Sequence, residues 1–229
     1  MKRFLIKAML LTLVTAYSYT AALFAQSVQD VSGKVYQVKN EGEITGTAFL
    51  FPEFLKGEIF RHGENSIKDL PLNFDAIDQL LLFKHTDGEI RGASGQIDSV
   101  IVKDKLGEKD IKRTFKKGYP QIASFSTATY YEVLLDRDLK FLKKVNKYIV
   151  EKSDYNSASK GSEIKEKVFY FIVRNGNIAE VSKNQKSVLS VFGEKTDALK
   201  QQIAVQKLNL RNEGDIIKLL IAIGSNFKK

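Results

Sequence analysis

Few side chains in this sequence are suited to catalysis or to metal binding. The chain has two histidines and no cysteine, so the commonest nucleophiles, bases and soft metal ligands are scarce. His62 and His85 each lie at a predicted turn, and neither has a second histidine at metal-binding spacing. We therefore expect both to be solvated surface residues, and we predict no metal site, no cofactor and no catalytic residue.

One set of residues follows the order of a serine protease triad: His62, then Asp75 or Asp78, then Ser94. The spacing argues against that function, because His62 and Ser94 are too close in the chain for the two-barrel scaffold that aims such a triad. Residues 92–95 also lack the G-x-S-x-G pattern of the other large class of serine hydrolases. We expect an ordinary serine in a turn.

Two pairs of carboxylates are candidates for the acid and base of a glycoside hydrolase. They are Asp136 with Asp138, and Glu163 with Glu166. Both pairs lie in predicted turns or highly charged segments, where solvated acids keep ordinary pKa values and make poor general acids. The sequence contains no glycine-rich phosphate-binding loop either.

Aromatic residues and lysines interleave between positions 130 and 171. The aromatic residues are Tyr130, Tyr131, Phe141, Tyr148, Tyr155, Phe169, Tyr170 and Phe171, and the lysines are Lys140, Lys143, Lys144 and Lys147. The favoured interpretation is a two-faced sheet with core aromatics and lysines that extend to solvent. The alternative is a basic, aromatic-lined surface for an anionic envelope glycan or a partner protein. Its contact residues would be Tyr131, Lys143, Lys144, Lys147 and Tyr148.

The first 25 residues have the order of a secretory signal peptide. Lys2 and Arg3 precede an apolar run over residues 4–14, and small or apolar residues continue to Ala25. We predict cleavage between Ala25 and Gln26, or alternatively before Val28. A retained anchor is disfavoured because polar residues dilute the second half of the run. We therefore expect export to the periplasm, to the outer membrane or out of the cell, with no transmembrane segment left after cleavage.

Composition narrows the class of protein further. Without cysteine, the chain is neither a cysteine-linked lipoprotein nor a disulfide scaffold, and residues 26–229 are enough to build a substantial core. Loss of Lys2, Arg3 and Lys7 with the signal would lower the formal net charge from +9 to +6. Acids are interspersed among the basic residues, which favours a role of this charge in solubility over nucleic-acid binding.

Residues 26–182 read as an antiparallel β domain. Tight turns are predicted at Asn175-Gly176, at Asp87-Gly88, around residues 62–65 and around residues 136–138. Turns this frequent indicate a meander that forms a curved sheet or an open barrel. Residues 107–120 fit a helical turn or a strand equally well.

Residues 183–229 read as a C-terminal helical segment. Three helices are predicted from apolar spacing. The first contains Val188, Leu189 and Phe192 before Gly193; the second contains Ala198, Leu199, Gln202 and Ile203; the third follows Asn212 and contains Ile216, Leu219, Leu220 and Ile223. Because such stripes must cover something apolar, we predict an α+β fold in which this segment packs on the sheet.

Several short motifs carry a resemblance to a family of proteins. They are FLFPEFLKG at 49–57, IKDLPLNF at 67–74, YEVLL at 131–135, LKK at 142–144, KLNL at 207–210 and DIIKL at 215–219. Through them the mature chain resembles an uncharacterised family of exported proteins from Bacteroidota-type bacteria. The resemblance implies export and a sheet followed by helices, and it implies no activity or ligand.

These observations favour a non-catalytic binding or structural module of the bacterial cell envelope. Its partner would be an envelope protein or an anionic surface polymer, and not nucleic acid. Two alternatives stay open: a hydrolase acting on envelope material, which needs a concave pocket with converging acids or a histidine, and a carrier of a small apolar ligand, which needs an empty interior.

Overall fold

The computed structural model describes residues 33–37, 44–63, 65–152, 161–193 and 196–226. The predicted signal segment with its cleavage site at Ala25 and Gln26 lies outside the described residues, and so does Tyr155.

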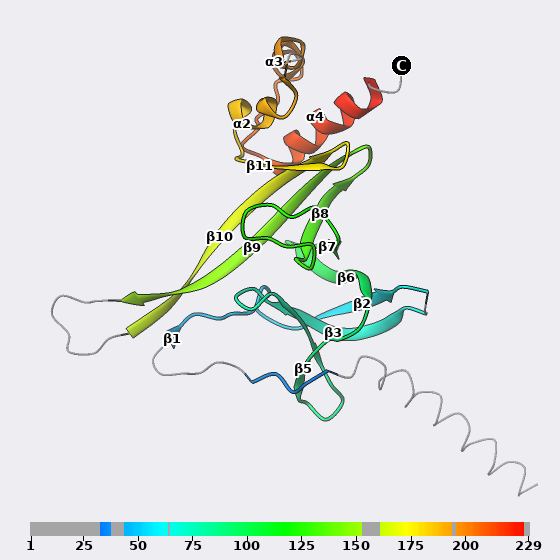
Figure 1. The fold of residues 1–229 in the computed structure, drawn as a ribbon, viewed down its shortest axis with the longest axis vertical. Helices are drawn as coiled ribbons and strands as arrows, with labels where there is room; N and C mark the ends of the chain where they lie inside the picture. The colour runs from blue at the N-terminus through cyan, green and yellow to red at the C-terminus, as the bar shows by residue number, and fades with distance from the viewer. Residues whose placement is uncertain (1–32, 38–43, 64, 153–160, 194–195, 227–229) are drawn as a thin grey trace, which may run out of the picture.

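A single large sheet forms most of the described structure (Figure 1). Its strands are β1 (Ile44–Thr45), β2 (Leu55–Arg61), β3 (Ile67–Asp75), β4 (Leu80–Lys84), β5 (Ile90–Gly92), β6 (Ile97–Leu106), β7 (Lys109–Lys116), β8 (Tyr131–Asp136), β9 (Leu139–Lys152), β10 (Gly161–Arg174) and β11 (Asn177–Val181). They lie in the order β1-β10-β9-β8-β7-β6-β2-β3-β4-β5, and β11 pairs with the same edge of β10 as β1. The sheet does not close, and the predicted α+β class with a curved sheet is confirmed.

Two antiparallel meanders make up this sheet. The first runs from β2 to β5 and the second from β6 to β11, and they join because β6 pairs with β2 instead of continuing beside β5. The pairing of β1 with β10 is parallel, whereas the other strand pairs in the described residues are antiparallel.

The predicted turns are where the chain reverses. Asn175 and Gly176 both have positive φ, 50° and 76°, as a type I′ turn requires, and they connect β10 to β11. Gly88 and Gly63 also have positive φ, in the turns after β4 and β2. The ambiguous segment around residues 107–120 contains strand β7, so the strand alternative holds and the helical one is wrong.

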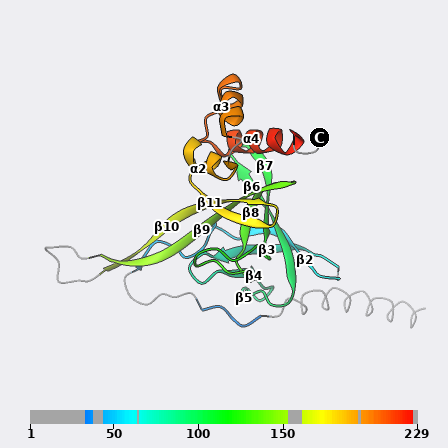
Figure 2. The same ribbon diagram turned by 45° about the horizontal axis from the view of Figure 1, so that its top comes forward.

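Helices follow the last strand and pack at one end of the sheet (Figure 2). In the described residues they are α2 (Gln185–Ser190), α3 (Thr196–Val205) and α4 (Glu213–Asn226). The predicted stripe of α4 is fully inside the protein: Ile216, Leu219, Leu220 and Ile223 are each at most 2% exposed. They form one core cluster with Phe141, Ile172 and other residues of β8 to β11. None of the helices in the described part of the chain has the length and apolar character needed to span a bilayer.

Two further core clusters lie away from the helices. One lies on β2, β3, β4, β6 and β7 and includes the ring contact between Phe74 and Phe115. The other lies where the loop of residues 117–130 covers β8, β9 and β10, and there Phe125, Tyr131 and Phe171 pack edge to face. The strands β8, β9 and β10 are therefore covered on both faces near the helices.

Asn73 is a fully buried polar residue that ties the segment before β2 to strand β3. Its Oδ1 accepts the backbone N–H of Phe51 (3.1 Å) and of Phe74 (2.8 Å). Its Nδ2 donates to the carbonyl oxygens of Phe51 (3.0 Å) and Glu53 (3.1 Å). Both ends of the amide are thus satisfied, as burial requires.

Candidate functional site

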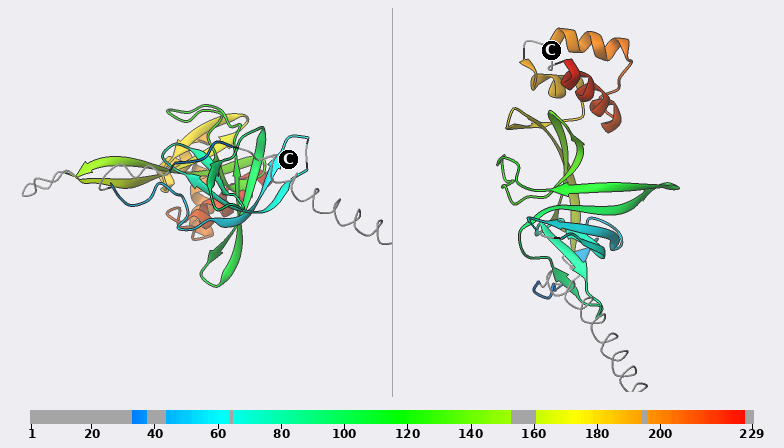
Figure 3. Two further views of the ribbon diagram at one scale, coloured as in Figure 1. Left: turned by 90° about the horizontal axis from the view of Figure 1, so that it is seen from below. Right: turned by 90° about the vertical axis from the view of Figure 1, so that its right-hand side faces the viewer.

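The longest hairpin of the sheet extends well beyond its neighbours. Strands β9 and β10 pair from Leu139 and Arg174 to Lys152 and Gly161, whereas β8 reaches only Lys143 on β9, and β11 reaches only Tyr170 on β10. We call residues 145–152 and 161–168 the arm. It projects sideways from the body, with β1 at its outer end (Figure 1, Figure 3).

Apolar side chains are exposed on the arm. Tyr148, Ile149 and Val168 are 41%, 44% and 37% exposed. Residues directly opposite each other share a face, so Tyr148 lies with Lys165 on one face, while Ile149 and the pair of Val145 and Val168 lie on the other. A two-stranded ribbon has little stability of its own in water. The exposed apolar surface of the arm is therefore suited to contact with another molecule.

The two tyrosines predicted as contact residues have different environments. Tyr131 is 0% exposed in the cluster under the 117–130 loop, and its hydroxyl has no hydrogen-bond partner among the described residues. Burial raises the pKa of Tyr131 to about 12. Tyr148 is on the arm and exposed. The structure thus places Tyr131 in the core and Tyr148 at the surface.

Lys143 joins helix α4 to the sheet. Its Nζ lies 2.9 Å from Glu213 Oε1, which also accepts the hydroxyl of Tyr170 at 2.7 Å. Burial acts to raise the pKa of Glu213, but the hydrogen bonds from Tyr170 and Lys143 outweigh it and hold this pKa below its usual value. Lys143 is therefore engaged within the protein.

Lys147 is also engaged within the protein, at the base of the arm. Its Nζ donates to the carbonyl oxygens of Thr47 (3.1 Å) and Phe49 (2.6 Å), and its backbone N–H donates to Ala76 O. These contacts fasten the segment after β1 and the end of β3 to β9. Of the five predicted contact residues, Tyr148 alone presents a large exposed side chain without such an internal bond in the described structure.

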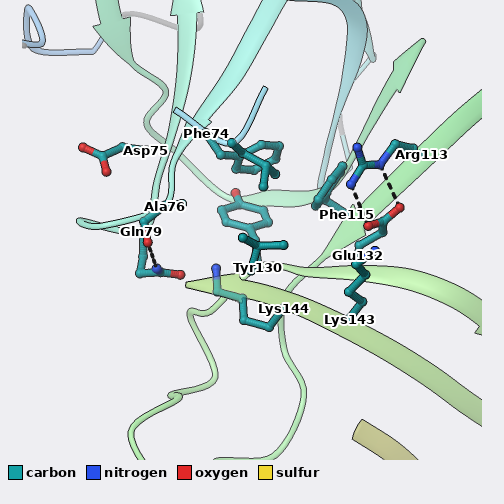
Figure 4. A pocket seen from close by; sticks show the side chains of 12 residues that line it. Phe74, Asp75, Ala76, Gln79, Arg113, Phe115, Tyr130, Glu132, Lys143 and Lys144 are labelled. Carbon is teal, nitrogen blue, oxygen red and sulfur yellow. Dashed lines mark hydrogen bonds and ion pairs between the residues drawn. The ribbon is translucent and has the colours of Figure 1, made fainter. Parts of the chain in front are cut away.

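Lys144 lies in a small internal cavity (Figure 4). It is 8% exposed, and its ammonium group forms no ion pair or hydrogen bond with the described residues. Removal from solvent lowers the pKa of Lys144 to about 8. In Figure 4 its Nζ points toward Gln79, whose buried Oε1 also has no hydrogen-bond partner in the described structure.

The size of this cavity limits its chemistry. It measures about 20 Å³, and Phe74 and Tyr130 form its apolar walls. This is room for about one water molecule. Arg113, which also lines it, is held by a two-bond contact with Glu132. A substrate does not fit between these groups, so the structure does not place Lys144 as a catalytic amine.

A second cavity, of about 150 Å³, lies beside the arm. Four isoleucines, from β1, from the segment after β3 and from the arm, line it: Ile44, Ile77, Ile149 and Ile164. At its polar end Tyr36 donates a hydrogen bond of 2.5 Å to Asp75. Burial and the bond to Asp75 raise the pKa of Tyr36 well above its usual value.

The residues that resemble a protease triad are engaged separately. Asp75 is 1% exposed and accepts the N–H groups of Ile77 and Asp78 as well as the hydroxyl of Tyr36. His62 lies 3.5 Å from Asp98, and both are largely exposed.

The other candidates for catalysis are at the surface. His85 pairs with Asp87 at 2.8 Å, in the turn between β4 and β5. Asp136 accepts hydrogen bonds from Lys116 and Lys140, which lower its pKa. In the described part of the chain, no group of three histidine or carboxylate residues could hold a metal ion.

Comparisons of this chain with protein-family models, with curated proteins and with solved structures gave no significant match.

Proposed function

We propose that this protein is an exported, non-catalytic binding or structural module of the bacterial cell envelope and that the arm is its contact surface. The observation that carries this proposal is the exposure of Tyr148, Ile149 and Val168 on a two-stranded projection. Elsewhere the large apolar residues of β9 and β10 are buried between the helices and the 117–130 loop. The apolar residues of the arm become covered when a partner binds.

One face of the arm suits a partner that carries negative groups. Lys165 and Lys167 are exposed beside Tyr148, and the ammonium group of Lys167 lies 4.6 Å from the ring centre of Phe169. This face combines cations with aromatic rings, which is the combination that the sequence predicted for a protein or anionic polymer partner. The lysines that provide it, however, are Lys165 and Lys167, because Lys143, Lys144 and Lys147 are engaged or buried.

A photo-activated cross-linking residue at position 148 is expected to capture one reproducible partner in the native envelope. The same residue at Lys105, an exposed position on β6 away from the arm, is the control and is expected to capture none. Mass spectrometry of the tagged protein identifies the adduct. Identical adduct patterns at the two positions, or recovery of uncross-linked protein from both, would contradict the proposal.

A second function, carriage of a small apolar ligand, is favoured by the 150 Å³ cavity beside the arm. A cavity of this volume accommodates a molecule the size of benzene. Its aliphatic wall provides apolar contacts, and the Tyr36 hydroxyl provides one polar contact.

Benzene is therefore expected to raise the Tm of the protein, by an amount that grows with the logarithm of its concentration above the Kd, because it binds the folded state. Ile164→Phe fills the cavity and should abolish that shift, while Val133→Phe enlarges a side chain remote from the cavity and should retain it. Thermal unfolding with and without benzene measures both. A wild-type Tm that does not respond to benzene eliminates the carrier function.

A further inference from the structure

The outer edge of β10 is interrupted between two short partner strands. β1 pairs with Ser162 and Glu163 at the tip of the arm, and β11 pairs with residues 170–174 at the helical end. Between them, residues 164–169 have no strand partner on this side in the described structure (Figure 1). A short length of strand edge is therefore open in the middle of β10.

The register shows which backbone groups face this opening. In a two-residue hairpin the residues that flank the turn form a hydrogen-bonded pair, so Arg174 directs its N–H and C=O groups toward β11. This direction alternates along a strand. Glu166 and Val168 therefore direct their backbone groups to the open edge, whereas Lys167 directs its own to β9.

The length of the opening selects the kind of partner. About five residues at 3.3 Å each give an opening of roughly 17 Å, which matches one short strand. A second copy of this chain is disfavoured, because its own β10 edge carries β1 and β11 at the same two places and these strands would collide. A short extended segment of another protein meets no such obstacle.

The side chains beside the opening select its composition. Lys165 and Lys167 lie on one face of the arm, where Lys165 forms an exposed ion pair with Glu163 at 3.9 Å. On the other face, Val168 lies opposite Val145, and Glu166 lies opposite Lys147. An added strand that alternates acidic and apolar residues complements the two faces. Its acidic side chains would lie beside the two lysines, and its apolar side chains would lie beside Val168.

We propose that residues 165–169 of β10 bind a short extended peptide segment of a partner protein as an added strand, one that alternates acidic with apolar residues. This inference rests on the proposed function and names its binding mode and partner class. Backbone hydrogen bonds to Glu166 and Val168 provide the affinity, and the two lysines provide the selectivity.

The test uses a labelled peptide that alternates glutamate and valine over five residues, together with a matched peptide in which lysine replaces glutamate. Fluorescence anisotropy with the full mature protein is expected to show saturable binding of the acidic peptide alone. Val168→Pro removes an N–H that faces the opening and leaves the bonds to β9 intact, so affinity should fall by about 10-fold. Val168→Thr keeps that N–H and the branched side chain, and should bind like the wild type.

Charge reversal provides a second test. The double variant Lys165→Glu, Lys167→Glu should exchange the preference and bind the lysine peptide. Equal binding of both peptides, no binding of either, or unchanged affinity of Val168→Pro would overturn the inference. If Val168→Pro still cross-links a partner through position 148, the binding function stands and the added-strand mode fails.

Discussion

Lys144→Met is expected to raise the free energy of unfolding by about 3 kcal/mol at pH 7. The folded protein lowers the pKa of Lys144 from 10.5 to about 8, which means that folding disfavours its charged form. At pH 7 the amine is protonated in both states, and the full cost of burying the charge opposes folding. Methionine keeps an unbranched side chain of similar length in contact with Phe74 and Tyr130 without that cost.

The same substitution has a pH dependence of defined sign. Between pH 8 and 10.5 the unfolded chain retains the proton of Lys144 and the folded protein has lost it, so wild-type stability rises with pH relative to Lys144→Met. The difference in free energy of unfolding between Lys144→Met and the wild type should therefore be largest below pH 8 and should shrink toward pH 10. Urea unfolding at pH 7, 9 and 10 measures it. Lys103→Met, at an exposed lysine of β6, is the control; equal stability of Lys144→Met and wild type at pH 7 would refute the prediction.

Asn73→Leu is expected to lower the free energy of unfolding by about 3 to 5 kcal/mol. Leucine has a similar size but leaves the N–H groups of Phe51 and Phe74 and the carbonyl of Phe51 without the bonds that Asn73 provides. Each buried backbone group left without a partner costs about 1 to 3 kcal/mol. This is a large fraction of the stability of an ordinary domain.

Urea unfolding at pH 7 measures this loss, and Asn65→Leu is its matched control. Asn65 is exposed in the turn after β2, where the same change of side chain leaves no buried group unsatisfied. We expect a change of within about 0.5 kcal/mol there. A loss of similar size in both variants would show that Asn73 has no special role.

Much of the fold could be predicted because it is encoded locally. The dipeptide Asn175-Gly176 requires positive φ at both positions, and the stripe from Ile216 to Ile223 requires a helix with one buried face. Strand order is not local. The chain passes from β5 back to β2 through β6, and no spacing within β6 indicates which strand it will pair with.

The candidate surface was only partly predictable for a related reason. Successive residues of a strand point to opposite faces, so Lys143 and Lys144 cannot belong to one patch, and this signal was present in the sequence. The sequence carried no signal for the burial of Lys144, because that burial depends on Phe74 and Gln79, which are far away in the chain. The roles of Asn73 and Tyr36 likewise depend on contacts between distant segments.

The parallel pairing of β1 with β10 has a consequence for the order of folding. Ile44 lies opposite Ser162, so this pairing closes a very long loop and gains only two pairs of residues. Hairpins such as that of β10 and β11 close short loops and form sooner. We therefore expect β1 to join the sheet last. Until then the tip of β10 is an additional unprotected edge, and a nascent chain is most prone to aggregation during this interval.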